Sequence, residues 1–180
     1  GIISPAKFIP IMEETGMVME MGEWVIRTAC TQYRKWRDEG LAPLRVAVNL
    51  SARQLREPNF VSVVERVLKQ TEVDPEALEI EITENMLMSD ATNSVVALDT
   101  LHDMGIRIAM DDFGTGYSSL NYLKRFPIDT IKIDGIFVAD IESDSEEVEI
   151  IKAIITMGHS LNRRVAAEGV ETEGQLSILE

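Results

Sequence analysis

Cysteine, positive charge and long hydrophobic runs are all scarce in this sequence of 180 residues. Cys30 is the single cysteine, so the chain cannot form an internal disulfide, which fits a reducing compartment. Its 17 lysines and arginines are outnumbered by 31 aspartates and glutamates, giving a formal net charge of −14. This balance argues against a protein that coats DNA or RNA, because such proteins need a positive surface. No apolar run approaches the roughly 20 residues of a membrane-spanning helix.

What is present is the composition of an ordinary globular domain, 45% hydrophobic and 27% charged. The length fits one domain rather than two, so we expect residues 1–180 to belong to a single domain. An acidic domain of this kind can still bind a phosphate-bearing ligand locally, provided that metal ions supply the positive charge.

Short apolar runs alternate with helical patterns along the chain. The runs that are typical of β-strands are Leu44–Leu50, Leu78–Ile82, Ile106–Met110, Thr130–Ile133 and Val165–Ala167. They lack clean alternation, as expected for a parallel sheet that is covered on both faces. Strands and helices in turn predict an α/β fold with right-handed crossovers. The pattern alone fits either an open doubly wound sheet or a closed barrel.

The segments between these runs show the spacing of amphipathic helices. One predicted apolar face holds Met21, Trp24, Val25, Ala29 and Trp36. Gly40 closes that helix.

The last predicted helix starts at a capping box of Thr172 and Gln175 and is still running at Glu180. About five strands are visible, whereas a (β/α)8 barrel has eight. We therefore expect the sequence to be a piece of a longer domain.

Polar residues stand at the carboxyl end of each apolar run. In chain order they are Asn49, Glu81, Glu84, Asp111, Asp112, Lys132, Asp134, Glu168 and Glu171. The carboxyl ends of parallel strands share one rim, where ligand sites form, so these residues are expected to converge. Amide and carboxylate oxygens are the ligands that Mg²⁺, Mn²⁺ and Ca²⁺ prefer. Neither histidine nor Cys30 falls on this rim, which disfavours a zinc site.

The adjacent pair Asp111 and Asp112 points to two ions. Neighbours in an extended strand face opposite ways. Both carboxylates reach one site only if the strand breaks, and Gly114 and Gly116 are predicted to supply that break. Two carboxylates in one site repel each other unless cations lie between them. Such a pair suits two metal ions that activate a water for in-line attack on phosphorus.

Each of these residues also has an ordinary structural role open to it. Asn49 fits as a cap of the turn after its strand, Glu81 and Glu84 as helix-start acids, and the two aspartates as turn formers. Lys132 fits a strand-end lysine whose ammonium reaches solvent. Their joint position at the ends of five strands is what favours the metal site.

Six motifs carry a resemblance to a known family. They are Phe8–Pro10, Asn49–Ser51, Glu81–Glu84, Asp111–Leu120, Lys132–Asp134 and Glu168–Glu171. Together they resemble the EAL-domain family, bacterial phosphodiesterases that linearise cyclic di-GMP to pGpG. The resemblance covers essentially the whole chain. It implies a modified TIM-like (β/α)8 barrel, incomplete at both ends, in which the visible strands are the third to the seventh.

The resemblance also implies metal ligands. Asn49, Glu81 and Asp111 look like ligands of a first divalent ion, and Asp112 like a ligand of a second ion or of its water. The implied cofactor is Mg²⁺ or Mn²⁺, with two ions in the complete domain, and Ca²⁺ is expected to inhibit.

Further roles follow from the same resemblance. Lys132 looks like the cation that orients the attacking water or steadies the phosphate, and Glu168 like a carboxylate on the metal–water cluster. Glu84 and Glu171 look like anchors behind the ligands, and Asp134 is expected close to the site.

The loop that follows the two aspartates resembles the family's mobile loop, which couples dimer contacts to metal and substrate binding. It includes Phe113, Gly114, Thr115 and Gly116. The implied partners are cyclic di-GMP, a second copy joined through the Asp112–Ser119 region, and sensor or GGDEF domains in the parent chain. The implied location is the bacterial cytoplasm, free or tethered to the inner membrane through other parts of the parent.

Two family features are missing: the strand with the Glu-Ala-Leu signature, whose glutamate is a metal ligand, and the C-terminal Gln-Gly motif. We therefore expect the parent domain to be catalytic and residues 1–180 alone to be inactive. A non-catalytic cyclic di-GMP receptor or protein-interaction module is the main alternative. An enolase-type barrel with a lysine base is a more distant one.

Overall fold

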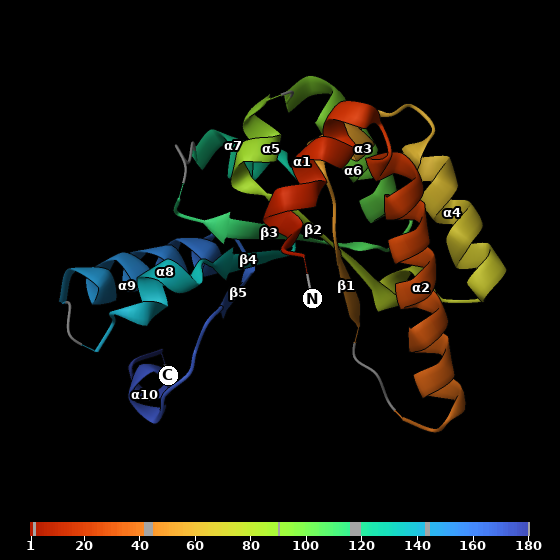
Figure 1. Ribbon diagram of the computed structural model, residues 1–180. Coiled ribbons are helices and arrows are strands. Elements are labelled where there is room, and N and C mark those ends of the chain that lie inside the picture. The colour runs from red at the N-terminus through yellow and green to blue at the C-terminus, as the bar shows by residue number, and fades with distance from the viewer. Residues whose placement is uncertain (2, 42–44, 90, 116–119, 143–144, 180) are drawn as a thin grey trace.

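The computed structural model describes residues 1, 3–41, 45–89, 91–115, 120–142 and 145–179. These form a five-stranded parallel sheet in the order β1-β2-β3-β4-β5 (Figure 1). The strands are β1 (Val46–Asn49), β2 (Leu78–Thr83), β3 (Arg107–Phe113), β4 (Thr130–Ile133) and β5 (Arg164–Ala167). All five predicted strands are confirmed, with ends that differ by at most a few residues.

Helices connect the strands. They are α1 (Pro5–Thr15), α2 (Val18–Asp38), α3 (Ala52–Arg56), α4 (Phe60–Thr71), a 3-10 turn (Pro75–Ala77), α5 (Glu84–Ser89), α6 (Ala91–Asp103), α7 (Leu120–Arg125), α8 (Gly135–Ala139), α9 (Ser145–Ser160) and α10 (Glu173–Leu179). Figure 1 shows α2 and α4 side by side at the β1 end of the sheet, and α8 with α9 at the β5 end. Within the described ranges, no helix is long and apolar enough to cross a membrane.

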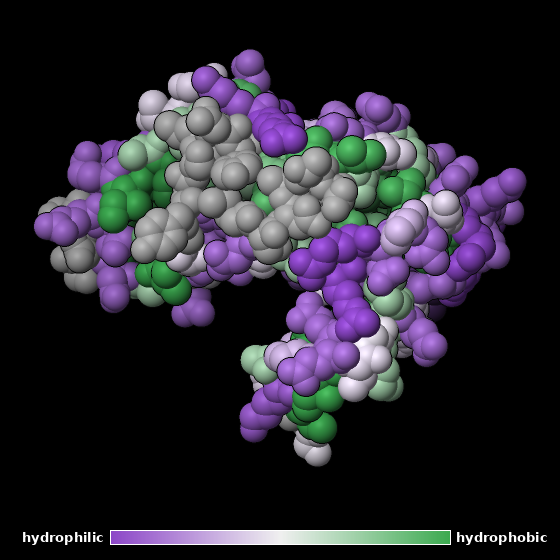
Figure 2. Space-filling model, turned by 90° about the horizontal axis from the view of Figure 1, so that it is seen from above, coloured by the Kyte–Doolittle hydropathy of each residue, from purple (hydrophilic) through white to green (hydrophobic). Residues whose placement is uncertain are grey.

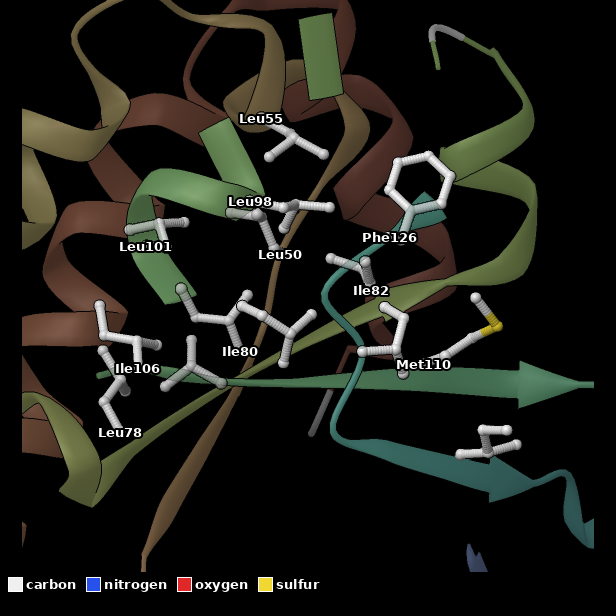
Figure 3. Close-up of a cluster of buried hydrophobic side chains, with 14 of the residues drawn as sticks. Leu50, Leu55, Leu78, Ile80, Ile82, Leu98, Leu101, Ile106, Met110 and Phe126 are labelled. Atoms are coloured by element: carbon white, nitrogen blue, oxygen red, sulfur yellow. The ribbon is translucent and has the colours of Figure 1, made fainter. Parts of the chain in front are cut away.

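One face of the sheet forms the hydrophobic core. Strand register places Ile80 beside Ile108, and Ile82 beside Met110, on this face. Their side chains meet leucines of α3 and α6 between the sheet and the helices (Figure 3). These residues are almost fully buried. At roughly 1.5–3 kcal/mol for each large buried side chain, this layer is a main source of stability.

The opposite face is polar. The same register places Glu81 between Asn49 of β1 and Ala109 of β3, and Lys132 beside Ala166 of β5. Strand β2 thus alternates cleanly, with isoleucines toward the helices and glutamates on the other side. For β2, the prediction that the strands lack clean alternation is therefore wrong, because its glutamates fall on one side and its isoleucines on the other.

Helix α2 buries only part of the predicted face: Val25 and Ala29 pack against the core, partly buried. Its buried residues are Val18, Gly22, Ile26 and Cys30, whereas Trp24 is 64% exposed. A residue two positions from Ile26 lies about 200° around the helix, so Trp24 points away from the core. The prediction that Trp24 and Trp36 share the apolar face is therefore wrong. Gly40 does follow the helix end, with φ +79°.

The surface seen from above is mostly hydrophilic, with hydrophobic residues in small patches between the polar ones (Figure 2). This agrees with the charge of −14 and with the placement of most large apolar side chains in the core.

Asp129, just before β4, ties the start of that strand to β3. Its carboxylate accepts hydrogen bonds from the Ile108 amide at 2.9 Å and from Arg107 Nη1 at 2.8 Å. His102 Nε2 lies 3.5 Å from the same carboxylate. Burial acts to raise the pKa of Asp129, but the Ile108 amide and Arg107 outweigh it and hold that pKa below its usual range.

We predict that Asp129→Asn lowers the free energy of unfolding by about 1–3 kcal/mol at pH 7, because a charge-assisted hydrogen bond is lost. A lowered pKa stabilises the fold above the unfolded-state pKa of about 3.9, and this stabilisation disappears as pH falls through the folded pKa. The difference between wild type and variant must therefore shrink in acid. Urea unfolding at pH 7 and at about pH 3 measures it. Asp99→Asn, at an exposed position of α6, is the control and is expected to change little.

Candidate functional site

The centre of the polar face is the ammonium of Lys132. Its Nζ lies 2.8 Å from Glu81 Oε1 of β2 and 3.3 Å from Asp111 Oδ1 of β3, and it also pairs with Glu168 just after β5. The Lys132 side chain is only 16% exposed. The structure thus brings together four of the predicted site residues, three from the neighbouring strands β2, β3 and β4 and one from the residue that follows β5.

Asn49 of β1 is the next predicted site residue along the sheet, on the β1 side of Glu81. It ends β1 directly opposite Glu81 in the strand register, and it is exposed at the edge of the sheet. The strand ends there because Ser51 and Gln54 form a capping box that starts α3. Asn49 and Glu81 are therefore neighbours on the polar face.

Strand β3 breaks at Asp112 itself. Its register with β4 shifts between Met110 and Phe113, and Asp112 has φ +55°, which is uncommon for a residue other than glycine. The break therefore comes before Gly114, whereas the sequence predicted that glycines 114 and 116 supply it. The charges of Asp111, Glu168 and Lys132 act on the pKa of Asp112, so its carboxyl lies near the cluster around Lys132.

The site holds more negative than positive charge. Burial, and then the charges of Asp111, Asp134 and Glu168, raise the pKa of Asp112. With Glu81, these make five carboxylates in or next to the cluster against one lysine, a formal balance of −4 when all are ionised.

Lys132 stays protonated in these surroundings. Burial acts to lower the pKa of Lys132, but hydrogen bonds to Glu168 and Glu81 and the charge of Asp111 raise that pKa above its usual range. These carboxylates therefore favour the ammonium form of Lys132.

Glu84 anchors the loop that follows β3. It is 4% exposed at the start of α5, and its Oε2 accepts a hydrogen bond from the Gly114 amide at 3.3 Å. Thr115 bonds back to the Asp112 carbonyl at 2.9 Å, and Phe113 is buried in the core. Gly116 and the rest of the predicted loop to Ser119 lie outside the described residues.

A close approach of two glycines positions Glu168. A Cβ on Gly169, which has φ +69°, comes within 3.2 Å of the Gly135 Cα. The ends of β4 and β5 meet here, which keeps Glu168 beside Lys132. Asp134 accepts a hydrogen bond from the Ile136 amide at 2.9 Å and so caps α8, while Glu171 is exposed, beyond the cluster around Lys132.

A groove of about 780 Å³ opens beside Asn49, between α1 and the carboxyl ends of β1 and β2. Its lining combines apolar side chains such as Ile9 and Met21 with polar ones such as Asn49, Thr83 and Asn85. A mostly apolar groove with a few polar groups is typical of a small-ligand site.

Sequence reasoning missed the contact between Gln54 of α3 and Gly22 of α2. Gln54 is 4% exposed and packs on the backbone of Gly22 in α2, where a Cβ would come within 1.7 Å of its Nε2. Gly22 is on the buried face of α2, but nothing in its neighbourhood in the sequence points to Gln54.

The letters Glu-Ala-Leu do occur in the sequence, at Glu76–Leu78. They lie in the 3-10 turn and first residue of β2, at the opposite end of the strand from the site. This tripeptide therefore does not supply a ligand to the cluster around Lys132.

The donors of the cluster fit divalent metal ions in kind, since they are carboxylate oxygens and one amide oxygen. Among the described residues, however, no three acidic, histidine or cysteine side chains lie close enough together to form a ready metal cage. Glu81, Asp111 and Glu168 gather around Lys132 Nζ instead. The structure therefore shows that these oxygens surround a positive charge, the Lys132 ammonium.

The family model of the EAL domain matches residues 1–180. The chain belongs to the EAL domain family. The bifunctional diguanylate cyclase/cyclic di-GMP phosphodiesterase MucR of Pseudomonas aeruginosa is 45% identical over 179 residues, which are 99% of this chain and 26% of MucR. The cyclic di-GMP phosphodiesterase PdeR of Escherichia coli is 40% identical over 179 residues, 99% of this chain and 27% of PdeR.

A solved structure named "PaMucR Phosphodiesterase, c-di-GMP complex" superimposes with a TM-score of 0.94 at 45% identity, over 99% of this chain and 72% of that one. The likeness decides between the two predicted folds: the described strands are part of a TIM-like α/β barrel. This EAL chain spans about a quarter of the length of the curated relatives MucR and PdeR.

We predict that Gly114→Ala costs about 2–4 kcal/mol of stability, because its φ of +102° is strained for alanine and the new Cβ lies 2.8 Å from the Phe137 ring. Gly40→Ala is the matched control. It has φ +79° with nothing within 4 Å of the new Cβ, so it loses only the backbone part, about 1–2 kcal/mol. Urea unfolding compares the two, and equal losses would contradict the contact with Phe137.

Proposed function

We propose that this domain hydrolyses cyclic di-GMP to linear pGpG with Mg²⁺ or Mn²⁺. The observation that carries the proposal is the cluster of Glu81, Asp111 and Glu168 around Lys132 at the carboxyl ends of the strands. The names of MucR, PdeR and the cyclic di-GMP complex support the choice of substrate.

The charge of the cluster explains why the proposal includes metal ions. A dinucleotide with two phosphates is repelled by five carboxylates, and one lysine does not offset them. Asn49, Glu81 and Asp111 are the proposed ligands of one ion, and Asp112 of the second ion or its water. Bound divalent ions supply positive charge to the phosphate and lower the pKa of water, which makes it a nucleophile at neutral pH.

The chain's own groups then have distinct tasks. Lys132 remains an ammonium, so it steadies the phosphate charge or orients the attacking water through its N–H groups. In the proposed step the water oxygen bonds to phosphorus as the P–O3′ bond breaks in line. The water's proton passes to a carboxylate, for which Asp112 and Glu168 near Lys132 are the proposed acceptors, and the 3′ oxygen leaves and takes up a proton. Glu84 holds the Gly114 amide and keeps the loop after β3 in place.

The groove beside Asn49 is the proposed place for part of the nucleotide. It adjoins the row of site residues, and its apolar lining from Ile9 and Met21 suits the face of a guanine. Its polar residues Thr83 and Asn85 suit the base edge or the ribose.

Regulation and assembly are proposed on the resemblance. They comprise a homodimer formed through the Asp112–Ser119 region, sensor or GGDEF domains in the same protein, a cytoplasmic site of action and inhibition by Ca²⁺. We also propose that residues 1–180 alone are inactive, because the family's Glu-Ala-Leu strand and Gln-Gly motif are not among them.

We predict that the intact protein converts cyclic di-GMP to pGpG in Mg²⁺ or Mn²⁺ and that Glu81→Gln lowers the rate by at least about 100-fold, because a ligand charge is lost. Chromatography of the product measures the conversion, and residues 1–180 are assayed beside the intact protein.

Glu79→Gln is the matched control. Glu79 is on the same strand and the same face, but about 7 Å nearer the other end, where it pairs with Arg164. Its variant is expected to keep most of the activity. Binding of cyclic di-GMP without turnover by the wild-type protein would contradict the proposal and favour a non-catalytic receptor.

A further inference from the structure

Lys132 contacts two of the carboxylates that are proposed as metal ligands. Its Nζ contacts carboxylates from β2, β3 and the end of β5. Glu81 and Asp111, two of the proposed metal ligands, are both buried, at 8% and 9% exposure. Two buried carboxylates on adjacent strands repel each other strongly unless a cation lies between them. In this structure that cation is the ammonium.

The oxygens of these carboxylates stand at hydrogen-bond distance from the ammonium. They lie 2.8 and 3.3 Å from Nζ, whereas Mg²⁺ binds oxygen at about 2.1 Å. No three acidic side chains in the described part of the chain come together as a metal cage. The oxygens must therefore close in, and Nζ must leave, before a divalent ion fits between Glu81 and Asp111.

We propose that Lys132 is the resident cation of the metal-free site, which keeps Glu81 and Asp111 in position and must be displaced from them when a divalent ion binds. The inference rests on the proposed function only in taking the same cluster as a metal site. It adds that metal and lysine compete for the same two carboxylates. Lys132 is then a positioning residue before it takes any part in the reaction.

Glu168 is the partner that the Lys132 ammonium keeps after it leaves Glu81 and Asp111. It also pairs with Lys132, and its side chain is 39% exposed, so it lies on the open side of the cluster. The flexible lysine stem lets Nζ keep this partner while it leaves the two buried ones. Binding of the metal and retreat of the lysine are thus one coupled change, and removing the lysine must by reciprocity strengthen metal binding.

The experiment measures Mn²⁺ affinity and thermal stability of the intact protein after removal of metal with EDTA. Lys132→Met removes the charge at similar length, and Lys132→Arg keeps the charge. Lys152→Met is the control, because Lys152 is 62% exposed and pairs only with the neighbouring helix residue Glu149 among the contacts of the described residues. Mn²⁺ is followed by electron paramagnetic resonance, and unfolding by circular dichroism.

The expected result is that Lys132→Met binds Mn²⁺ at least about tenfold more tightly than wild type. In EDTA it melts at a lower temperature than wild type, and saturating Mn²⁺ removes that difference. Lys132→Arg stays close to wild type in affinity, and Lys152→Met changes neither quantity. An unchanged or weaker Mn²⁺ affinity in Lys132→Met would overturn the proposal.

Lys132→Gln is measured as a second neutral variant. If both neutral variants fail to fold even in Mn²⁺, the proposal is also overturned, because a bound ion should replace the lysine charge. Cyclic di-GMP turnover by the wild type is scored separately. Tighter Mn²⁺ binding without turnover rejects the proposed function alone, and turnover without the affinity gain rejects this inference alone.

Discussion

Repulsion between carboxylates is the constraint around which this domain is organised. Parallel strands deliver Glu81, Asp111 and Glu168 to one face of the sheet, and burial strengthens the repulsion between them. Lys132 offsets part of that repulsion from the middle of β4. The surplus of negative charge is the reason why we propose divalent cations at this site, and through them a phosphate ligand that an acidic protein otherwise repels.

The register of the strands determines where these carboxylates lie. Each strand gives its apolar side chains to the core beneath the helices and its polar ones to the opposite face, so packing of the isoleucines fixes where the carboxylates stand. The register shift at Asp112 then brings a further carboxylate toward the same face. Side chains on one face of the strands thus stabilise the fold, and those on the other face form the site. A one-residue shift in strand register would exchange the two faces.

Local pattern was enough to predict the strands and the residues at their ends, because apolar runs and the polar residues after them are adjacent in the sequence. The two exposed tryptophans of α2 were assigned to the wrong face because several overlapping apolar stripes fit the same helix. Contacts between distant segments, such as Gln54 on Gly22 or Asp129 on β3, leave no local signal. The backbone break at Asp112 was placed later, at the glycines, because a positive φ is expected there first.

The most direct test of the account is to locate Mn²⁺ in crystals of the intact protein by anomalous scattering, with cyclic di-GMP bound. The account predicts anomalous peaks beside Glu81, Asp111 and Asp112, with Lys132 Nζ moved away from Glu81. Peaks elsewhere, or Lys132 still paired with Glu81 and Asp111 at saturating Mn²⁺, would contradict it.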